Sequence, residues 1–242
     1  MFMPGCYSAG YRRIFAKRMI TVVIPAYNEG KHIADVVKKA SKYADYVVVV
    51  DNNSTDDTYQ AASDAGAIVV SEMVQGAGAA TDKGFQIAKE LLSDVVITID
   101  GDGQHNAMDI PYLIEPILRN EADVVFGSRF LGQRMVIPSY RKFGIKLITL
   151  CCNLFSGEQL TDAQCGLRVF SKYSLLTFRL EEHGYGIMIE QIMKARSLHL
   201  RVREMPVQCL YRDFENDSGM NPVKQGILTL LCILKWRFKL WV

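Results

Sequence analysis

Short runs of apolar, mostly β-branched residues alternate through the first half of the chain with segments whose apolar positions recur at helical spacing. Each run is followed by turn-forming residues, which is typical of buried strands. We predict strands over residues 20–25, 46–50, 67–71, 95–99 and 123–127. Helices are predicted between them over residues 31–42 and 108–120, and two further helices are predicted to end at about residues 65 and 92. Strands alternating with helices predict an α/β fold with a mainly parallel, doubly wound sheet covered on both faces.

The pattern changes after residue 127. We expect a helix rich in aromatic, basic and large apolar residues over 139–155, a strand over 167–170, a helix over 186–197 and strand-like residues over 201–210. Residues 226–242 are strongly apolar but end in basic residues, and they are too short and too charged for a membrane span of about 20 apolar residues. An amphipathic helix at a membrane interface, with Trp236 and Trp241 at headgroup level, fits better. The alternative is a helix packed on the domain or on a second subunit.

A chain of 242 residues with 49% hydrophobic and 22% charged residues can bury a sizeable core. We expect a leader or flexible arm over residues 1–18, one main domain over 19–215 and a C-terminal amphipathic segment over 216–242 that serves the membrane interface or oligomerisation. The six cysteines show no metal-binding spacing, which fits free thiols in a reducing compartment. The leader lacks the apolar core of a signal peptide.

The small net charge of +2 conceals an asymmetry along the chain. Through Asp123 there are 17 acidic and 11 basic residues, which leaves 9 acidic and 17 basic, so the two parts carry −6 and +8. Residues 124–157 contain no acidic residue. A basic second half indicates an anionic partner such as phosphate groups or a membrane surface. Nucleic-acid binding is disfavoured, because the basic residues are interleaved with long apolar runs rather than spread over a polar face.

Carboxylates follow three of the predicted strands. Glu29 comes after the first strand, Asp51 after the second, and Asp100 with Asp102 after the fourth, where Gln104 follows. Because ligands of open α/β sheets bind outside the carboxyl ends of the strands, we expect these side chains to share one crevice. Carboxylate oxygens suit Mg²⁺ or Mn²⁺, and a cation there would hold a nucleotide diphosphate. The alternative is an Asp/Gly turn without a metal.

The glycine- and alanine-rich segment over residues 75–84 has two interpretations. It could cradle a phosphate, but it matches neither common phosphate-binding fingerprint in its proper place. The favoured interpretation is that its small residues pack a helix closely against the sheet.

Several segments, taken in order, resemble family-2 glycosyltransferases of the GT-A fold. Residues 23–29 (VIPAYNE) resemble the opening motif of the family, residues 51–56 (DNNSTD) its second motif, and residues 100–102 (DGD) its metal motif. Residues 127–129, 161–168 (TDAQCGLR) and 204–207 (EMPV) are similar to the branch that uses polyprenyl phosphates, which includes the dolichyl-phosphate mannose synthases. The resemblance covers the chain from about Ile20 to its end.

The resemblance implies roles for individual residues. The nucleotide sugar would be bound by Pro25, Tyr27, Glu29, Asp51, Asp100 and Arg129; the metal, Mg²⁺ or Mn²⁺, by Asp100, Asp102 and Gln104; and the acceptor phosphate by Arg129, Arg212 and Lys224. The implied catalytic set is Asp102, Arg129, Asp162 and Arg212. The chain departs from the family pattern at Asn52 and Asn53, where Asp and Gly are usual, although Asn also tolerates a left-handed turn.

The expected reaction is inverting transfer of a hexose from a GDP-mannose or UDP-glucose type of donor to a dolichyl or other polyprenyl phosphate. A lipid phosphate is already largely ionised near neutral pH, whereas a saccharide hydroxyl acceptor would need a base, for which Asp162 is the candidate. His105 could contact phosphate or serve as structural support. A catalytically silent nucleotide-binding scaffold is a further alternative. We expect peripheral association with the cytoplasmic face of a membrane, and a homo-oligomer or a membrane subunit as further partners.

Overall fold

The computed structural model describes residues 18–132, 137–209 and 222–239. Its strands are β1 (Ile20–Ala26), β2 (Tyr46–Asp51), β3 (Ile68–Ser71), β4 (Val95–Thr98), β5 (Val124–Ser128), β6 (Arg168–Ser171) and β7 (Val202–Pro206). Its helices are α1 (Ile33–Ala40), α2 (Thr58–Asp64), α3 (Ala77–Glu90), α4 (Ile110–Leu118), α5 (Ser139–Ser156), α6 (Lys172–Thr177), α7 (Ile187–Ser197) and α8 (Pro222–Lys239), and a short 3₁₀ helix, η2 (Ala107–Asp109), precedes α4.

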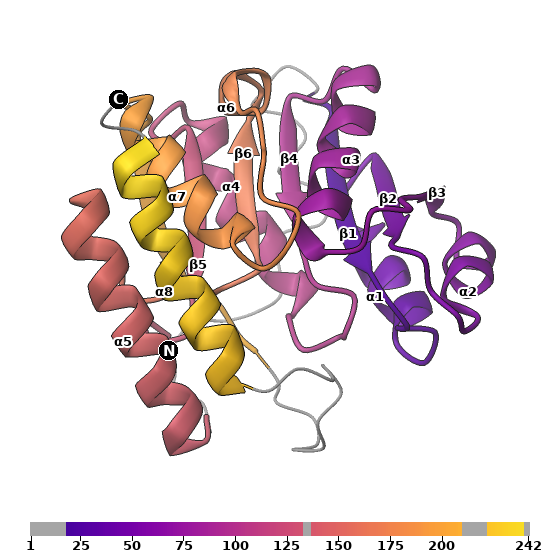
Figure 1. Ribbon diagram of the computed structural model, residues 1–242. Helices are drawn as coiled ribbons and strands as arrows, with labels where there is room; N and C mark the ends of the chain where they lie inside the picture. The colour runs from indigo at the N-terminus through magenta and orange to yellow at the C-terminus, as the bar shows by residue number, and fades with distance from the viewer. Residues whose placement is uncertain (1–17, 133–136, 210–221, 240–242) are drawn as a thin grey trace.

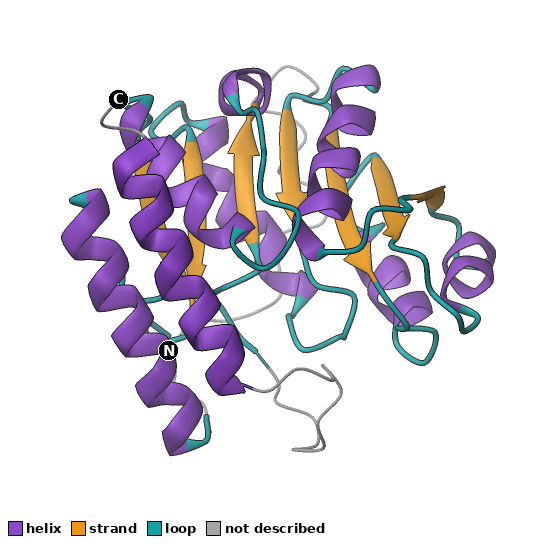
Figure 2. Cartoon of the chain, in the orientation of Figure 1, coloured by secondary structure: helices purple, strands orange, loops and turns teal. Residues whose placement is uncertain are grey.

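The strands form one sheet in the order β3-β2-β1-β4-β6-β5-β7 (Figure 1). β1 pairs in parallel with β2 and β4, β2 with β3, and β5 with β7. β6 is antiparallel to both of its neighbours, and Figure 2 shows its arrow pointing opposite to those of β4 and β5. The prediction of a mainly parallel α/β sheet is therefore confirmed.

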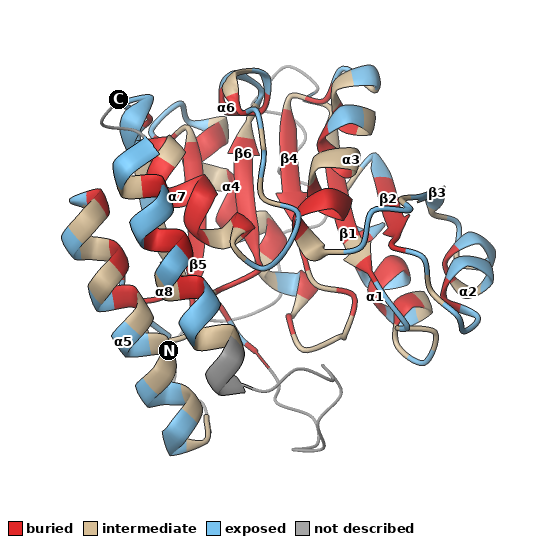
Figure 3. Ribbon diagram, viewed as in Figure 1, coloured by how far each residue is buried: buried red, intermediate tan, exposed pale blue. Residues whose placement is uncertain are grey.

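The two faces of the sheet bury separate cores. Alternate residues of β1 and β2 face opposite sides, so Val22 and Val49 join one core while Val23 and Val48 join the other. Helices α1, α2 and α4 cover the first face, and helices α3, α5, α6, α7 and α8 contribute to the second. Figure 3 shows the central strands as almost continuously buried. Near-continuous apolar runs are typical of strands that are covered on both faces.

Helix α3 explains the glycine-rich segment. A Cβ at Gly84 would collide with the Cγ1 of Val23 on β1, so only glycine permits this close approach. The amides of Gly78 and Ala79, at the start of the helix, donate to the backbone carbonyl of His183 at 2.7 and 3.0 Å. The segment therefore packs a helix on the sheet, as favoured, and these two amides already have a protein acceptor.

Three details differ from the sequence predictions. The last strand ends at Pro206 instead of about residue 210, and α6 was not predicted. Helix α8 packs against α5 and α7, and its Trp236 is only 1% exposed. The prediction that Trp236 lies at headgroup level is therefore wrong, since the indole is part of the core; Trp241 lies outside the described residues. In the ranges that the structure describes, no helix is both long and apolar enough to cross a bilayer.

Candidate functional site

The carboxyl ends of β1, β2 and β4 meet at one edge of the sheet. Ala26 is the register partner of Asp51, and the amide of Asn52 donates to the carbonyl of Ala26 at 2.8 Å. On the other side of β1, Val23 pairs with Thr98, which brings residues 100–102 beside the end of β1. The register of the sheet thus brings together the predicted acidic side chains, as parallel strands require.

Side-chain hydrogen bonds join the loops that follow β1 and β2. Thr58 Oγ1 accepts from the amide of Glu29 at 2.7 Å, and Asn28 Oδ1 accepts from the amide of Thr55 at 2.8 Å. Asn53 has a left-handed backbone with φ of 62°. An asparagine can occupy that conformation, as expected for the departure from the usual glycine.

Asp100 and Asp102 differ in their electrostatic surroundings. Burial would raise the pKa of Asp100, but a hydrogen bond from His105 and the charges of His105, Arg129 and Arg168 outweigh it and lower the pKa. The contact joins His105 Nε2 to Asp100 Oδ2 at 3.2 Å. Burial raises the pKa of Asp102, and the negative charge of Asp100 raises it further. The two carboxylates at the end of β4 therefore repel each other, and this repulsion contributes to the raised pKa of Asp102.

The donor set at this position fits a hard divalent cation. Carboxylate oxygens are the preferred ligands of Mg²⁺ and Mn²⁺, and a cation would relieve the repulsion between Asp100 and Asp102. Residues 18–132, 137–209 and 222–239 contain no cluster of three or more His, Cys, Asp or Glu side chains able to hold a metal. Two carboxylates alone suit a cation that takes its remaining ligands from a bound diphosphate and water. The backbone N–H of Gln104 donates to Asp102 Oδ1 at 2.9 Å and so orients that carboxylate.

One carboxylate oxygen of Asp51 in this crevice has no hydrogen-bond partner. The residue is 7% exposed, and its Oδ1 is buried without a hydrogen-bond partner. A buried carboxylate oxygen without a donor costs free energy, so such an atom marks a place where a ligand group can bind. The neighbouring Asn52 is used structurally: its amide nitrogen donates to the carbonyls of Glu72 and Val74, and its oxygen accepts from the amide of Gly76.

Arg129 follows β5 at the same edge and forms a forked ion pair with Asp162. Its Nε and a terminal guanidinium nitrogen donate to the two carboxylate oxygens at 2.6 and 2.9 Å, and its backbone amide donates at 3.2 Å. Gln164 adds a backbone donor at 3.1 Å. Burial would raise the pKa of Asp162, but the hydrogen bonds and charge of Arg129 lower it. The side chain of Asp162 is fully buried, whereas that of Arg129 is 12% exposed.

The loop before β6 lies directly against the acidic pair. The carbonyl of Gly166 accepts from Thr98 Oγ1 at 3.0 Å, and a Cβ at Gly166 would collide with the carboxylate of Asp100. Because β6 runs antiparallel to β4, the residues that precede it meet the residues that follow β4. This reversal delivers Asp162 and Gln164 to the site. Gln164 Nε2 is a second buried atom without a partner, and His105 Nδ1 is a third.

Sequence reasoning missed two residues that hold this loop. The carboxylate of Glu204, on β7, accepts from the amides of Thr161 and Asp162 at 2.8 and 2.9 Å. Arg168 is 1% exposed and donates to the carbonyls of Ala163 and Cys165, both at 2.9 Å. Burial lowers the pKa of Arg168 to about 10, so it stays charged at neutral pH. Both residues stood in recognised motifs, but nothing local in the sequence indicates which backbone groups they bind.

The remaining predicted residues lie in different parts of the structure. Pro25 is half-buried at the end of β1, and Tyr27 beyond it is 50% exposed. Glu29 is half-buried in the loop that is bonded to Thr58. Arg212 lies outside the described residues, and Lys224 lies in the first turn of α8 but its side chain is not described. The structure therefore tests neither acceptor-phosphate assignment on these two residues.

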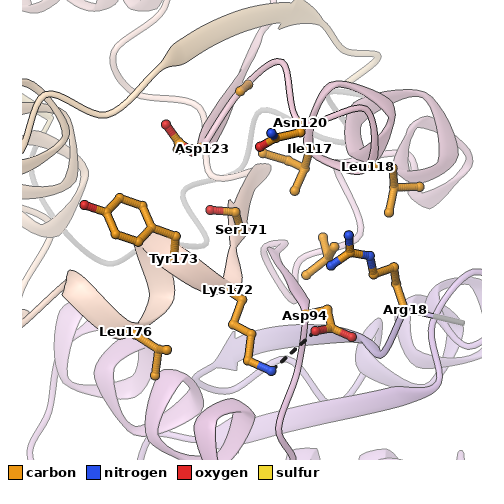
Figure 4. A pocket seen from close by; sticks show the side chains of 12 residues that line it. Arg18, Asp94, Ile117, Leu118, Asn120, Asp123, Ser171, Lys172, Tyr173 and Leu176 are labelled. Carbon is orange, nitrogen blue, oxygen red and sulfur yellow. Dashed lines mark hydrogen bonds and ion pairs between the residues drawn. The ribbon is translucent and has the colours of Figure 1, made fainter. Parts of the chain in front are cut away.

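A cavity of about 570 Å³ lies at the opposite edge of the sheet (Figure 4). It is lined in part by Asp94 before β4 and Asp123 before β5, and an ion pair joins Asp94 to Lys172 at 3.4 Å. Its position at the amino ends of β4 and β5 separates it from the acidic residues at their carboxyl ends. This cavity is not part of the candidate site.

Comparison with known proteins gives a consistent result. Residues 21–177 match the model of glycosyl transferase family 2. A UDP-N-acetylglucosamine–dolichyl-phosphate N-acetylglucosaminyltransferase of Methanococcus voltae is 31% identical over 229 residues, covering 85% of this chain and 91% of the relative. An undecaprenyl-phosphate mannosyltransferase of Micrococcus luteus is 30% identical over 237 residues, covering 90% of this chain and 93% of the relative.

Solved structures agree on the fold. Glucosyl-3-phosphoglycerate synthase of Mycobacterium tuberculosis, solved with Mn²⁺, UDP and glucosyl-3-phosphoglycerate, is similar with a TM-score of 0.70 and 25% identity. The similarity covers 89% of this chain and 80% of that one. The sheet and its covering helices therefore have the GT-A architecture expected from the motifs.

Proposed function

The chain belongs to glycosyltransferase family 2, and on that premise we propose that it transfers a hexose from a nucleotide-diphosphate sugar to a polyprenyl phosphate of the dolichyl type. The transfer is metal-dependent and inverts the anomeric configuration. Relatives named for dolichyl-phosphate and undecaprenyl-phosphate substrates support the acceptor class. The sugars in the names of these two relatives differ, so the proposed donor is a UDP- or GDP-linked hexose or hexose derivative.

The observation that carries the proposal is the convergence of Asp51, Asp100 and Asp102 at one sheet edge. The orphaned oxygen of Asp51 can accept from a base or ribose of the nucleotide. Pro25, Tyr27 and Glu29 complete the nucleotide pocket. Asp100 and Asp102, with Gln104, would hold Mg²⁺ or Mn²⁺. Such a cation, when bound, supplies positive charge that stabilises the departing nucleoside diphosphate.

The protein side chains supply orientation. Asp162 holds the guanidinium of Arg129 in a fixed plane, and a planar, permanently charged fork suits phosphate groups of donor or acceptor. Arg212 and Lys224 are proposed as further ligands of the acceptor phosphate. The attacking oxygen belongs to an ionised phosphate, so the chemical step needs no proton acceptor from the protein.

The surroundings of Asp162 support a phosphate acceptor over a saccharide hydroxyl. A general base must reach the proton that it removes, but the oxygens of Asp162 are buried and already accept from Arg129 and Gln164. A lowered pKa also makes this carboxylate a weaker base. If a saccharide hydroxyl were the acceptor, Asp162→Asn would abolish the chemical step without weakening donor binding.

We also propose that the outer surfaces of α5 and α8 meet the cytoplasmic face of a membrane, where a polyprenyl phosphate resides. The two helices lie side by side at one end of the molecule (Figure 1). Both leave large apolar side chains exposed, here called the α5/α8 apolar surface: Phe143, Leu147, Leu150 and Leu154 on α5, and Ile227, Leu231, Leu234 and Phe238 on α8. Lys142 and Lys146 are exposed beside them, which suits anionic lipid. A second copy of the chain is the competing occupant.

A two-stage experiment tests the function. Thermal unfolding with UDP- and GDP-sugars and Mn²⁺ identifies the donor, because a ligand of the native state raises the melting temperature. Transfer from that donor to a polyprenyl phosphate is then assayed for wild type and Asp102→Asn. We expect transfer by wild type and a loss of about 100-fold or more in the variant.

Asp35→Asn is the matched control, since Asp35 is exposed on α1 and pairs only with Lys39 in the described contacts. It should leave transfer unchanged. Donor binding without transfer to any lipid phosphate would contradict the proposed acceptor. Donor binding without transfer to any acceptor would favour the silent nucleotide-binding scaffold, and no metal-dependent nucleotide binding would contradict the proposed donor class.

A further inference from the structure

The imidazole of His105 lies directly against one carboxylate of the acidic pair. Its Nε2 is 3.2 Å from Asp100 Oδ2. The side chain of His105 is only 4% exposed, whereas that of Asp100 is 43% exposed. The carboxylate is therefore accessible to a ligand in the crevice, while the imidazole that contacts it is closed off from solvent.

The loop before β6 confines the same carboxylate. A Cβ at Gly166 would lie 2.1 Å from Asp100 Oδ2 and 2.5 Å from Oδ1, so the backbone of Gly166 already closes against both oxygens. The carbonyl of Gly166 accepts from Thr98 Oγ1 at 3.0 Å, which fixes this backbone on β4. Asp100 is thus held between a backbone that limits its position and a ring nitrogen that sets the plane of its carboxylate.

The backbone that carries His105 is tied to the segment that follows β7. His105 forms an isolated antiparallel bridge with Cys209. The backbone N–H of Asn106 donates to the carbonyl of Gln208, and Asn106 Nδ2 donates to Gln208 Oε1, both at 3.3 Å. In the other direction, the backbone N–H of Gln208 donates to Asp109 Oδ2 at 2.7 Å. These bonds fix the backbone of the imidazole from outside the loop that holds the acidic pair.

The contacts of His105 suit a partner of the carboxylate better than a ligand of the cation. Among the residues that the structure describes, no three His, Cys, Asp or Glu side chains form a group able to hold a metal, so His105 does not complete such a set with Asp100 and Asp102. Because Nε2 donates to Asp100, Nδ1 is the unprotonated nitrogen of a neutral ring. Nδ1 is buried away from the crevice surface and has no hydrogen-bond partner in the described residues.

We propose that His105 is a positioning residue, whose Nε2–H holds the carboxylate of Asp100 in the orientation that binds the divalent cation. Residues 208 and 209 hold the imidazole in place for this task. The proposal rests on the metal-dependent donor binding given under the proposed function. Removal of a group that orients a metal-binding carboxylate typically lowers the affinity for the metal about 10- to 100-fold.

Two amide substitutions of different length test the role of Nε2. Mn²⁺ is titrated into the protein with UDP or GDP, and free Mn²⁺ is measured by its EPR signal. Gln has its amide nitrogen as many bonds from Cα as Nε2 of His, whereas the amide nitrogen of Asn corresponds to Nδ1. We expect His105→Asn to weaken Mn²⁺ binding about 10- to 100-fold. His105→Gln, which keeps a donor for Asp100, should stay within about threefold of wild type.

Thermal unfolding of the same variants separates positioning from a purely structural role. A lower melting temperature of His105→Asn with unchanged Mn²⁺ affinity would overturn the proposal. Equal losses of Mn²⁺ affinity in His105→Asn and His105→Gln would also overturn it, because the hydrogen bond to Asp100 would then not matter.

Asn106→Ala tests the contribution of the segment after β7. This neutral change removes the amide that donates to Gln208 but keeps the backbone N–H. It should weaken Mn²⁺ binding about threefold in the wild type, as for one hydrogen bond, and should add no loss to His105→Asn, because it acts through His105. The same loss in both backgrounds would overturn the role of residues 208 and 209. Asn106→Ala also keeps the proposal testable if the His105 variants unfold.

His199→Asn is the control for the loss of an imidazole. His199 is exposed between α7 and the amino end of β7, at the opposite edge of the sheet, and asparagine tolerates its left-handed φ of 52°. It should leave Mn²⁺ binding unchanged. Wild type that binds no Mn²⁺ with either nucleotide would overturn the metal-dependent donor site and this proposal together, whereas wild-type binding that is insensitive to His105→Asn overturns this proposal alone.

Discussion

Asp162 and Arg129 form the most completely bonded charged pair at the site. The carboxylate of Asp162 accepts from the side chain and backbone of Arg129 and from the backbone of Gln164, and it is fully buried. Glu204 accepts from the backbone amide of Asp162 itself. An arginine held in this way has already lost most of its conformational freedom before it meets a phosphate, so little further entropy is lost on binding.

Asp162→Asn should lower the free energy of unfolding at pH 7 by about 3 kcal/mol, because it leaves the guanidinium of Arg129 without its charged partner. The pKa of Asp162 is lowered in the folded protein. The stabilisation is therefore complete above the ordinary carboxyl pKa of about 4 and is lost as the pH falls through the lower folded value. Urea unfolding from pH 3 to 8 should show the difference between wild type and variant shrinking only at the acid end. A constant difference over the whole range would contradict the pair.

Gly166→Ala should impair the site without unfolding the protein. The new Cβ would displace the flexible carboxylate of Asp100, while the surrounding loop stays bonded to Arg168 and Thr98. We expect transfer activity to fall about ten- to hundredfold, since a misplacement of about 1 Å has effects of that size. Gly132→Ala is the control, because its Cβ would lie at an ordinary 3.5 Å from Pro206. Equal activity of the two variants would show that the position of Asp100 is not critical.

Residues that follow strands were predictable, and residues that act through the backbone of distant loops were not. Asp51, Asp100 and Asp102 end apolar runs, so strand register alone brings them together. Glu204, by contrast, is 43 positions from Thr161, and its carboxylate accepts a hydrogen bond from the backbone amide of that residue. Its role depends on which strand becomes the neighbour of β5, and that pairing leaves no local pattern in the sequence.

At the scale of elements, the contact of α3 with β1 depends on a single small residue. Gly84→Ala should lower the free energy of unfolding by about 1–3 kcal/mol, because the added methyl group meets Val23 in a packed core. Gly144→Ala on α5 should raise it by about 0.5–1 kcal/mol, since nothing lies within 4 Å of the new Cβ and alanine favours the helix. Urea unfolding of both variants measures the contrast. A destabilised Gly144→Ala would contradict the described exposure of α5.

The sequence predicted that these helices exist, but it did not predict what their apolar faces pack against. The spacing of apolar residues located α3, α5 and α8, but the same pattern suits burial against a protein or a lipid surface. Trp236 can be buried because its indole N–H donates to Glu182 and because Lys194 lies over the face of its ring. Neither partner is visible from the sequence of α8 itself.

For the whole molecule, the α5/α8 apolar surface predicts membrane binding. Wild type should sediment with anionic phospholipid vesicles and release at high salt, because Lys142 and Lys146 are exposed beside the apolar residues. Serine at Phe143, Leu150 and Leu154 should weaken vesicle binding about tenfold or more, given about 0.8 kcal/mol for each buried CH₂ group.

Leu92→Ser is the matched control, because Leu92 is 72% exposed beyond the far end of α3. Light scattering in the absence of lipid measures the oligomeric state, and so distinguishes a membrane from a second copy of the chain as the partner of this surface. A dimer that the triple serine variant dissociates, together with no binding of wild type to vesicles, would assign the surface to a second copy of the chain.

The reversed strand has a consequence for biosynthesis. β6 is translated after β5 but lies between β5 and β4, so a nascent chain that ends at Ser128 has no strand to join β5 to the earlier sheet. All four residues of β4 are buried in the finished protein, yet one edge of that strand stays open on the ribosome until residues 168–171 emerge. β6 therefore has to insert between two strands that were synthesised before it, and until it does, chaperones or neighbouring nascent chains compete for the open edge of β4.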